Sequence, residues 1–140
     1  APVASAGHAR DARASADGGL ATGSTVWDAG IVLARLAASS LSAAAPSVLL
    51  DLGSGTGHVG LTAAACAPPG AVAAVVLTDL PAVRPLLEEN AEANRGAMPA
   101  GVAVRVRDMR WESPESVAAV AREVCGLRRA PPGGGPPGGV

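Results

Sequence analysis

The segment from Asp51 to Gly57, which reads Asp-Leu-Gly-Ser-Gly-Thr-Gly, has the composition of a loop that holds a ligand against its main chain. Glycine adopts backbone conformations that other residues avoid, and it lets a ligand approach the backbone closely. The residues that follow are typical of a helix, whose first turn offers unpaired N–H groups. Gly55, Gly57 and Gly60 also match G-x-G-x-x-G, the spacing of nucleotide-binding loops. The segment therefore predicts a site for a nucleotide-like cofactor, in which Gly53, Ser54, Gly55 and Gly57 contact the ligand.

Two acidic residues distinguish between the cofactors that such a loop can hold. Asp51 stands at the mouth of the loop, where a dinucleotide would place its pyrophosphate, and a carboxylate there would repel the phosphates. S-adenosylmethionine has no phosphate, and a nearby carboxylate favours its sulfonium and amino groups. Asp79, about 20 residues beyond the glycines, has the spacing of an acid that binds ribose hydroxyls. We therefore favour S-adenosylmethionine as the cofactor, with an NAD(P)-binding oxidoreductase as the alternative.

Asp79 also has a purely structural interpretation, as the N-cap of a helix that begins near Pro81. The two interpretations are equally good for this residue alone. Its separation from the glycine loop makes ribose binding the better prediction.

The only aromatic residues of the chain are Trp27 and Trp111. An isolated tryptophan is usually an anchor in the core or at its rim. However, both are expected near the carboxyl ends of strands, where an adenine ring needs apolar cover, so we predict that both contact the cofactor. We interpret His58, which begins the helix after the loop, as a solvated residue of the first turn.

Short apolar runs and helical patterns alternate along the chain, and this alternation defines the scaffold for these residues. It predicts right-handed crossovers and an α/β fold with a Rossmann-like, doubly wound parallel sheet in the spatial order 3-2-1. Strands are expected at 47–52, 72–78 and 102–107, and helices at 27–41, 58–67, 81–94 and 114–126. In the third strand Arg105 and Arg107 alternate with valines, which indicates a solvated face at a sheet edge.

Two of the helices have features that predict their environment. The helix at 27–41 is apolar on more than one side and is expected to be buried, with a capping box formed by Thr25 and Asp28. Pro85 lies inside the pattern of the helix at 81–94. That helix must therefore start near Arg84 or be kinked there.

Composition sets the domain boundaries and excludes several classes of function. We expect a flexible leader at 1–23, one partial cofactor-binding domain at 24–127, and a disordered Pro/Gly-rich tail at 128–140. The net charge of −1 argues against nucleic-acid or membrane partners. The chain has no lysine, which excludes a P-loop, and two distant cysteines predict no metal site.

Several segments together resemble the seven-β-strand (class I) S-adenosylmethionine-dependent protein-lysine methyltransferases, of the methyltransferase-like family 16 type. The matching segments are 23–33 around Val-Trp-Asp, 48–60 around the glycine loop, 77–80, and the segment that ends at Trp111. The resemblance implies a class I methyltransferase fold whose cofactor contacts fall on Trp27, Gly53, Ser54, Gly55, Asp79 and Trp111. It also implies a protein substrate with a lysine acceptor. We expect a cytoplasmic location, with the nucleus as an additional one and with targeting to an organelle left open.

The family continues with a fourth strand and an Asp-x-x-Tyr signature on the acceptor side. This chain has no tyrosine, and nothing after Trp111 is typical of such a strand. We therefore expect only the N-terminal part of the family's domain, with the fold truncated after the third strand. A non-catalytic remnant is a further alternative, because the chain alone is expected to show no measurable methyl transfer.

Overall fold

The computed structural model describes residues 22–129, in which helices and strands alternate as the sequence predicts. The elements are α2 (Asp28–Ser39), β1 (Ser47–Leu52), α3 (His58–Cys66), β2 (Val72–Asp79), α4 (Arg84–Ala93), the 3-10 turn η2 (Arg95–Ala97), β3 (Ala103–Asp108) and α5 (Pro114–Arg129). Their positions confirm the expected α/β class.

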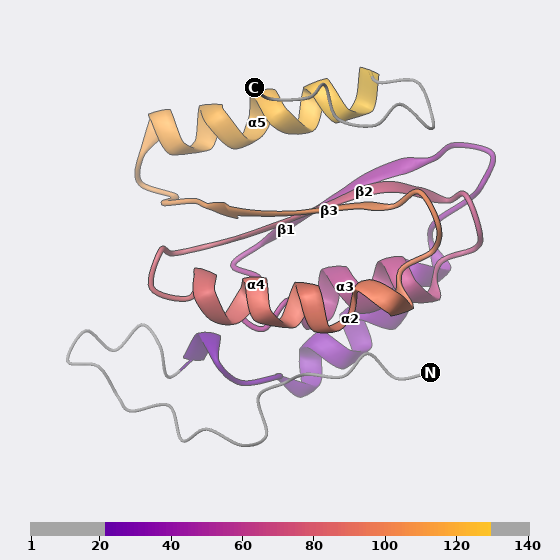
Figure 1. The fold of residues 1–140 in the computed structure, drawn as a ribbon, viewed down its shortest axis with the longest axis horizontal. Coiled ribbons are helices and arrows are strands. Elements are labelled where there is room, and N and C mark those ends of the chain that lie inside the picture. Colours follow the sequence, from indigo (N-terminus) through magenta and orange to yellow (C-terminus); the bar gives the residue numbers. More distant parts are fainter. Residues whose placement is uncertain (1–21, 130–140) are drawn as a thin grey trace.

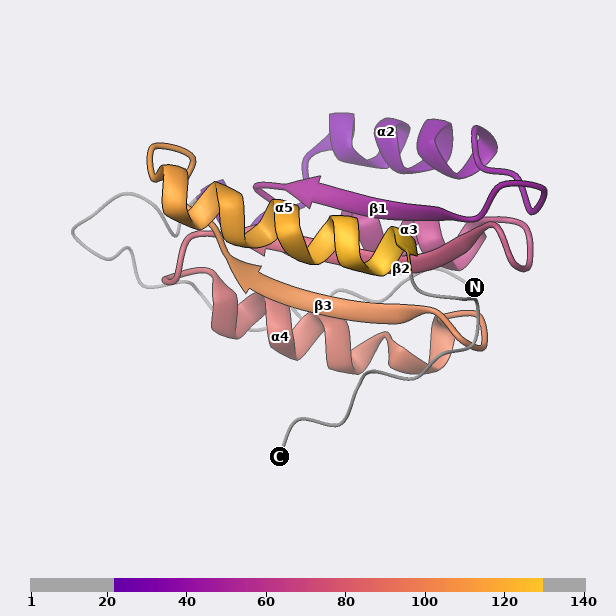
Figure 2. The same ribbon diagram turned by 90° about the horizontal axis from the view of Figure 1, so that it is seen from above.

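The three strands form one parallel sheet in the order β1-β2-β3, which confirms the predicted arrangement (Figure 2). Leu50 of β1 pairs with Val76 of β2, and Asp79 at the end of β2 pairs with Asp108 at the end of β3. The carboxyl ends of the strands therefore meet at one edge, where open α/β sheets bind their ligands.

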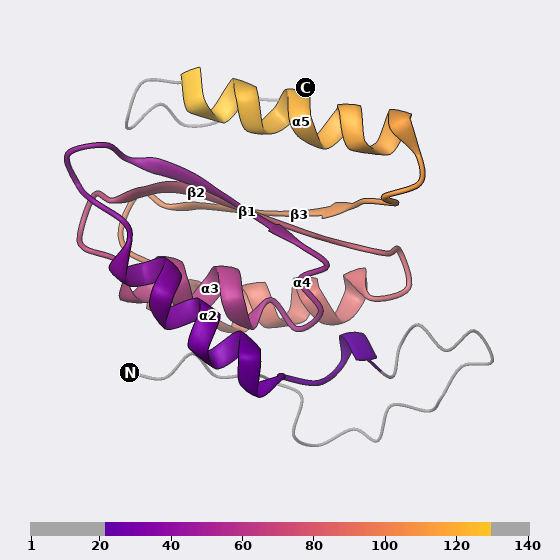
Figure 3. The same cartoon turned by 180° about the vertical axis from the view of Figure 1, so that it is seen from behind.

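Helices cover both faces of this sheet (Figure 1). On one face lies α5; α3 and α4 lie on the other, and the view from behind in Figure 3 shows the same layers. Because β2 lies at the centre of these layers, its side chains are almost all buried. A strand buried on both sides needs a continuous apolar sequence, and Val-Ala-Ala-Val-Val-Leu provides it.

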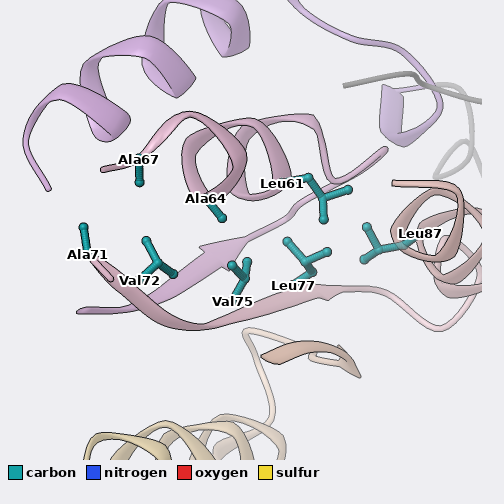
Figure 4. Close-up of a cluster of buried hydrophobic side chains, with 8 residues drawn as sticks. All are labelled: Leu61, Ala64, Ala67, Ala71, Val72, Val75, Leu77 and Leu87. Carbon is teal, nitrogen blue, oxygen red and sulfur yellow. The ribbon is translucent and has the colours of Figure 1, made fainter. Parts of the chain in front are cut away.

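The main core cluster lies between β2 and the two helices α3 and α4 (Figure 4). Leu61 of α3, Leu77 of β2 and Leu87 of α4 are its largest fully buried side chains. Ala64 and the other buried alanines allow α3 to pack closely on the sheet, since they leave no long side chain between the layers.

The structure contradicts the expectation that the helix at 27–41 is buried. Only Ala34 and Ala38 of α2 are buried, whereas the side chains of Val32 and Leu36 are 68% and 61% exposed. The reason is position: α2 packs on α3 beyond the β1 edge, and small residues make that contact. The predicted capping box is also wrong, because α2 is capped by Trp27 without any side-chain hydrogen bond.

The arginines of β3 do not form a solvated face, contrary to the prediction. Helix α5 covers that side, and Arg107 donates two hydrogen bonds of 2.7 Å to the carboxylate of Glu123. Arg105 lies 4.0 Å from the same carboxylate. Glu123 thus pairs with the charges of the two arginines, on a face that the alternation of arginine and valine had predicted to be in solvent.

Helix α4 begins at Arg84, so the first of the two alternatives for Pro85 holds. A proline in the first turn of a helix loses no hydrogen bond, because the N–H groups there have no partner within the helix.

The predicted leader and tail lie almost entirely outside the described residues. Thr22 and Gly23 have helical backbone, and α5 continues to Arg129, two residues past the predicted boundary of the domain. Within residues 22–129, no helix is long and apolar enough to cross a bilayer, and no cluster of His, Cys, Asp and Glu is arranged to hold a metal ion.

Candidate functional site

The turn between β1 and α3 requires glycine at three positions. Gly53, Gly55 and Gly57 have φ angles of 68°, 54° and 78°, in the left-handed region that other residues rarely adopt. A Cβ atom at Gly57 would also lie 2.8 Å from Leu87 Cδ1. Both the sharp turn and its close packing on α4 therefore require glycine, which has no side chain.

Ser54 ties this turn to the end of β2. Its amide donates to the carbonyl of Thr78 at 2.8 Å, and its hydroxyl accepts from the amide of Thr78 at 3.0 Å. Both hydroxyls, of Ser54 and of Thr78, donate to the carbonyl of Asp51 at 2.9 Å. This network ties the turn after β1 to the end of β2. Ser54 and Asp51 were predicted as part of the site, whereas Thr78 was not.

The side chain of Asn90 ties the turn to α4, and the sequence prediction missed it. The Asn90 amide donates to the carbonyl of Thr56 at 3.0 Å, and both residues are buried. A signal for it exists in the sequence. Val83, Leu87, Asn90 and Asn94 follow helical spacing and are all buried, so the apolar positions place the asparagines on the inner face.

Asp79 is held rigidly beside the turn. One carboxylate oxygen accepts from the amide of Gly55 at 2.7 Å, and the other accepts from the amide of Leu80 at 2.7 Å. Each oxygen keeps a second lone pair for a further donor. The cap of α4 is Val83, so Asp79 is not the N-cap of the helix that follows it.

Asp51, in β1, does not line the cavity that opens at the strand ends, so the prediction that it stands at the mouth of the loop is wrong; its carboxylate faces α3 instead. Its carboxylate accepts from the amide of Gly60 at 2.9 Å. Burial raises the pKa of this carboxyl above its ordinary value, the Gly60 amide opposes that shift, and the negative charge of Asp79 adds to it. The two carboxylates therefore make the region around the turn electronegative.

A cavity of about 520 Å³ opens where the strands end, between the glycine turn and the segment that precedes α2. This volume is within the range of small-molecule sites. Its lining residues are Thr22, Gly23, Thr25, Val26, Trp27, Gly30, Gly53, Ser54, Gly55, Thr56, His58, Val59, Asp79, Leu80, Met109, Trp111 and Glu112. Of the eight residues predicted to bind a cofactor, six line this cavity; Asp51 and Gly57 lie just behind its wall.

The two tryptophans both line the cavity and are largely exposed, at 61% for Trp27 and 67% for Trp111. The ring of Trp111 lies against the turn, since a Cβ atom at Gly53 would be 3.2 Å from its Cζ2 atom. The indole N–H of Trp27 donates to the carbonyl of Thr22 at 3.2 Å. Neither is a core anchor, because most of each ring surface is free.

The interpretation of His58 as a solvated residue is wrong. The side chain lines the cavity, and its Nε2 atom is buried without a hydrogen-bond partner among the described residues. On the other side of the ring, Nδ1 lies 3.5 Å from the hydroxyl of Thr62. A buried ring nitrogen without a partner is uncommon in a folded protein and marks a place where a bound molecule can supply one.

Several further lining residues carried no signal that the sequence analysis used. Met109 is buried, and its amide donates to the carbonyl of Asp79 at 2.8 Å, so the end of β3 is joined to the end of β2. Leu80 and Glu112 complete that side. Their proximity to the predicted acids and tryptophans in the sequence is the only hint of their place.

Comparison with known proteins agrees with this geometry. The model of a family described as lysine methyltransferase matches residues 9–124, which is most of the chain and includes every element that lines the cavity. No curated protein matches the chain. On the strength of that match, the chain is a member of the lysine methyltransferase family.

Proposed function

We propose that this protein binds S-adenosylmethionine in the cavity beside the glycine turn and serves the transfer of its methyl group to a lysine of another protein. One observation carries the cofactor half of the proposal. Asp79 and the glycine turn, 24 residues apart in sequence, are joined by the hydrogen bond from the Gly55 amide and face one cavity. Membership of the family supports the lysine acceptor.

The residues present fit this cofactor in three respects. Gly53 and Gly55 line the cavity without side chains, so a ligand can approach the backbone of the turn closely. The exposed tryptophan rings offer apolar cover for an adenine. The buried Nε2 of His58 lacks a partner, and a cofactor rich in polar atoms can provide one.

Each group of the site has a role that follows from its chemistry. Asp79 accepts hydrogen bonds from ribose hydroxyls, and its fixed position lowers the entropy cost of that contact. Asp51 and Asp79 together favour a cationic ligand over one that carries phosphates. When bound, S-adenosylmethionine supplies an electrophilic methyl group for attack by a neutral amine. The protein's contribution is mainly to orient the reactants, which is worth ~7–11 kcal/mol in well-aligned systems.

The two tryptophans make a direct test of the cofactor half possible, because they give the only two indole N–H signals in an NMR spectrum. Both signals should shift when S-adenosylhomocysteine is added to isotope-labelled protein. The shifts should be absent with NAD⁺ at the same concentration. Movement of both indoles by NAD⁺ but not by S-adenosylhomocysteine would contradict the proposal.

The acceptor half needs a separate experiment. The protein is incubated with methyl-labelled cofactor and a cell lysate, and the labelled proteins are hydrolysed to amino acids. Label recovered in methyllysine supports the proposed acceptor, and it overturns the expectation that this chain alone transfers no measurable methyl group. Label recovered in methylarginine or in small molecules contradicts it.

A further inference from the structure

One wall of the cavity is formed by residues 22–27, a segment here called the N-terminal strap, which leads into α2 (Figure 3). The strap residues that line the cavity, together with Asp79 and Trp111, are Thr22, Gly23, Thr25, Val26 and Trp27. The strap is distant in sequence from the glycine turn, so its position depends on contacts with the rest of the domain.

The first of these contacts is backbone against backbone. A Cβ atom at Gly55 would lie 2.8 Å from the carbonyl oxygen of Gly23 and 3.5 Å from its carbonyl carbon and Cα atoms. A real side chain never approaches a backbone atom so closely, so Gly55 must lack a side chain for the strap to lie where it does. The strap thus rests directly on the turn that forms the floor of the cavity.

The second contact is on the other side of Gly23. A Cβ atom there would lie 3.1 Å from Cγ2 and 3.4 Å from Cγ1 of Val83, the residue that caps α4. Val83 is only 1% exposed, and a β-branched side chain in a packed core has little freedom to move aside. Gly23 is therefore held between the glycine turn and the start of α4, and a methyl group there would fit only if the Val83 side chain moved aside by a few tenths of an ångström.

A hydrogen bond inside the strap maintains its shape. The indole of Trp27 donates to the carbonyl of Thr22, which is five residues earlier. This bond links the two ends of the strap, so a displacement at Gly23 moves the Trp27 ring as well.

From this geometry we infer that Gly23 is a positioning residue: its lack of a side chain lets the strap close on the glycine turn, and this closure sets how long the cofactor remains bound. The statement about residence time rests on the proposed function. The statement that Gly23 lets the strap close concerns the protein without ligand and is independent of the proposed function.

The test uses Gly23→Ala, with Gly96→Ala as the matched control. Gly96 lies in η2 with no atom within 4 Å of an added Cβ, so the same chemical change there is free of contacts. Hydrogen exchange of amides 23–27 in the ligand-free protein reports the closure of the strap. Stopped-flow displacement of S-adenosylhomocysteine, followed by tryptophan fluorescence, reports the residence time.

We expect Gly23→Ala to accelerate exchange in the strap and to raise the dissociation rate about tenfold, since changes within one site act mostly on dissociation. Gly96→Ala should change neither quantity. The double variant Gly23→Ala/Val83→Ala removes the atoms that obstruct the new methyl group and should restore both quantities toward those of Val83→Ala alone. This rescue distinguishes strap closure from a general loss of stability.

The outcomes separate the two proposals. If the wild-type protein binds no S-adenosylhomocysteine, the proposed function fails, while strap exchange still decides whether Gly23 holds the strap closed. Unchanged strap exchange in Gly23→Ala overturns the inference even where the ligand binds. Faster exchange in the strap without faster ligand dissociation refutes the claim that strap closure sets the residence time. If adding Val83→Ala does not reverse the effects of Gly23→Ala, the contact between Gly23 and Val83 is not what holds the strap.

Discussion

Asp79 lies where the glycine turn, the end of β2 and the cavity meet. Its oxygens accept from the Gly55 and Leu80 amides, and these bonds hold the carboxylate in place before any ligand arrives. A carboxylate whose position is already fixed binds hydroxyl groups at a smaller entropy cost than a mobile one. The affinity for an adenosine-containing cofactor should therefore depend strongly on this one side chain.

Replacing Asp79 with asparagine should weaken S-adenosylhomocysteine binding by roughly 10- to 150-fold, because a hydrogen bond to a charged group contributes about 1.5–3 kcal/mol. The matched control is Asp108→Asn. Asp108 pairs with Asp79 across the sheet but does not line the cavity. Calorimetric titration measures both variants. Equal losses of affinity in Asp79→Asn and Asp108→Asn would show that affinity depends on the negative charge near the strand ends and not on a direct contact between Asp79 and the ligand.

The pKa of Asp51 predicts how stability depends on pH. Because burial raises this pKa in the folded protein, the carboxyl stabilises the fold while it is protonated, below the ordinary value near 3.8. That contribution is lost as the pH rises through the raised pKa. An asparagine side chain remains neutral and can still accept from the Gly60 amide, so Asp51→Asn should gain thermal stability relative to wild type as pH rises from 4 to 8. Circular dichroism melts along this series test it, and a relative gain for the wild type would contradict the assigned shift.

For individual residues, the sequence predicted which residues belong to the site better than it predicted where their side chains point. The positions of Gly53, Gly55 and Asp79 follow from a loop and an acid at a recognisable spacing. The environments of Asp51 and His58 do not, because each depends on how α3 is placed on the sheet. The carboxylate of Asp51 accepts a hydrogen bond from the Gly60 amide, and the Nε2 atom of His58 is buried in the first turn of α3.

Among the elements, α4 is linked to the site through Asn90. Replacing Asn90 with alanine should lower the free energy of unfolding by about 1–3 kcal/mol, since the buried Thr56 carbonyl then loses its donor. Glu89→Ala is the control, because Glu89 is exposed on the same helix. Urea unfolding gives both values. A loss in Asn90→Ala no larger than in the control would show that the turn does not depend on this contact.

The order and direction of the strands were predictable because alternating strands and helices leave few arrangements. The environments of α2 and β3 were not predictable from their own patterns. An apolar helix indicates burial only if the rest of the fold reaches it, and α2 lies beyond the β1 edge. The arginines of β3 are covered because α5 brings Glu123, which is 16 residues beyond Arg107 in the chain, to them.

In the molecule as a whole, α2 and the edge strand β1 of the described sheet both expose apolar side chains. These are Val32, Leu33 and Leu36 of α2, with Leu50 and Leu52 of β1. An open strand beside exposed aliphatic groups favours association between copies.

Changing Val32 and Leu36 to glutamine should therefore reduce concentration-dependent light scattering without altering cofactor affinity, since neither residue lines the cavity. Val117→Gln on α5 is the control, because Val117 is an exposed aliphatic residue on the opposite face of the sheet. If the control reduces scattering as much as the double variant, association does not depend on this surface.

The cavity at the strand ends should select S-adenosylmethionine and its product over a dinucleotide. Calorimetric titration of the whole chain with S-adenosylhomocysteine and with NAD⁺, under identical conditions, tests it most directly. We expect saturable binding of S-adenosylhomocysteine, lost in large part on Asp79→Asn. We expect much weaker binding of NAD⁺, because the carboxylates near the turn repel its pyrophosphate. Tighter binding of NAD⁺ than of S-adenosylhomocysteine would contradict it.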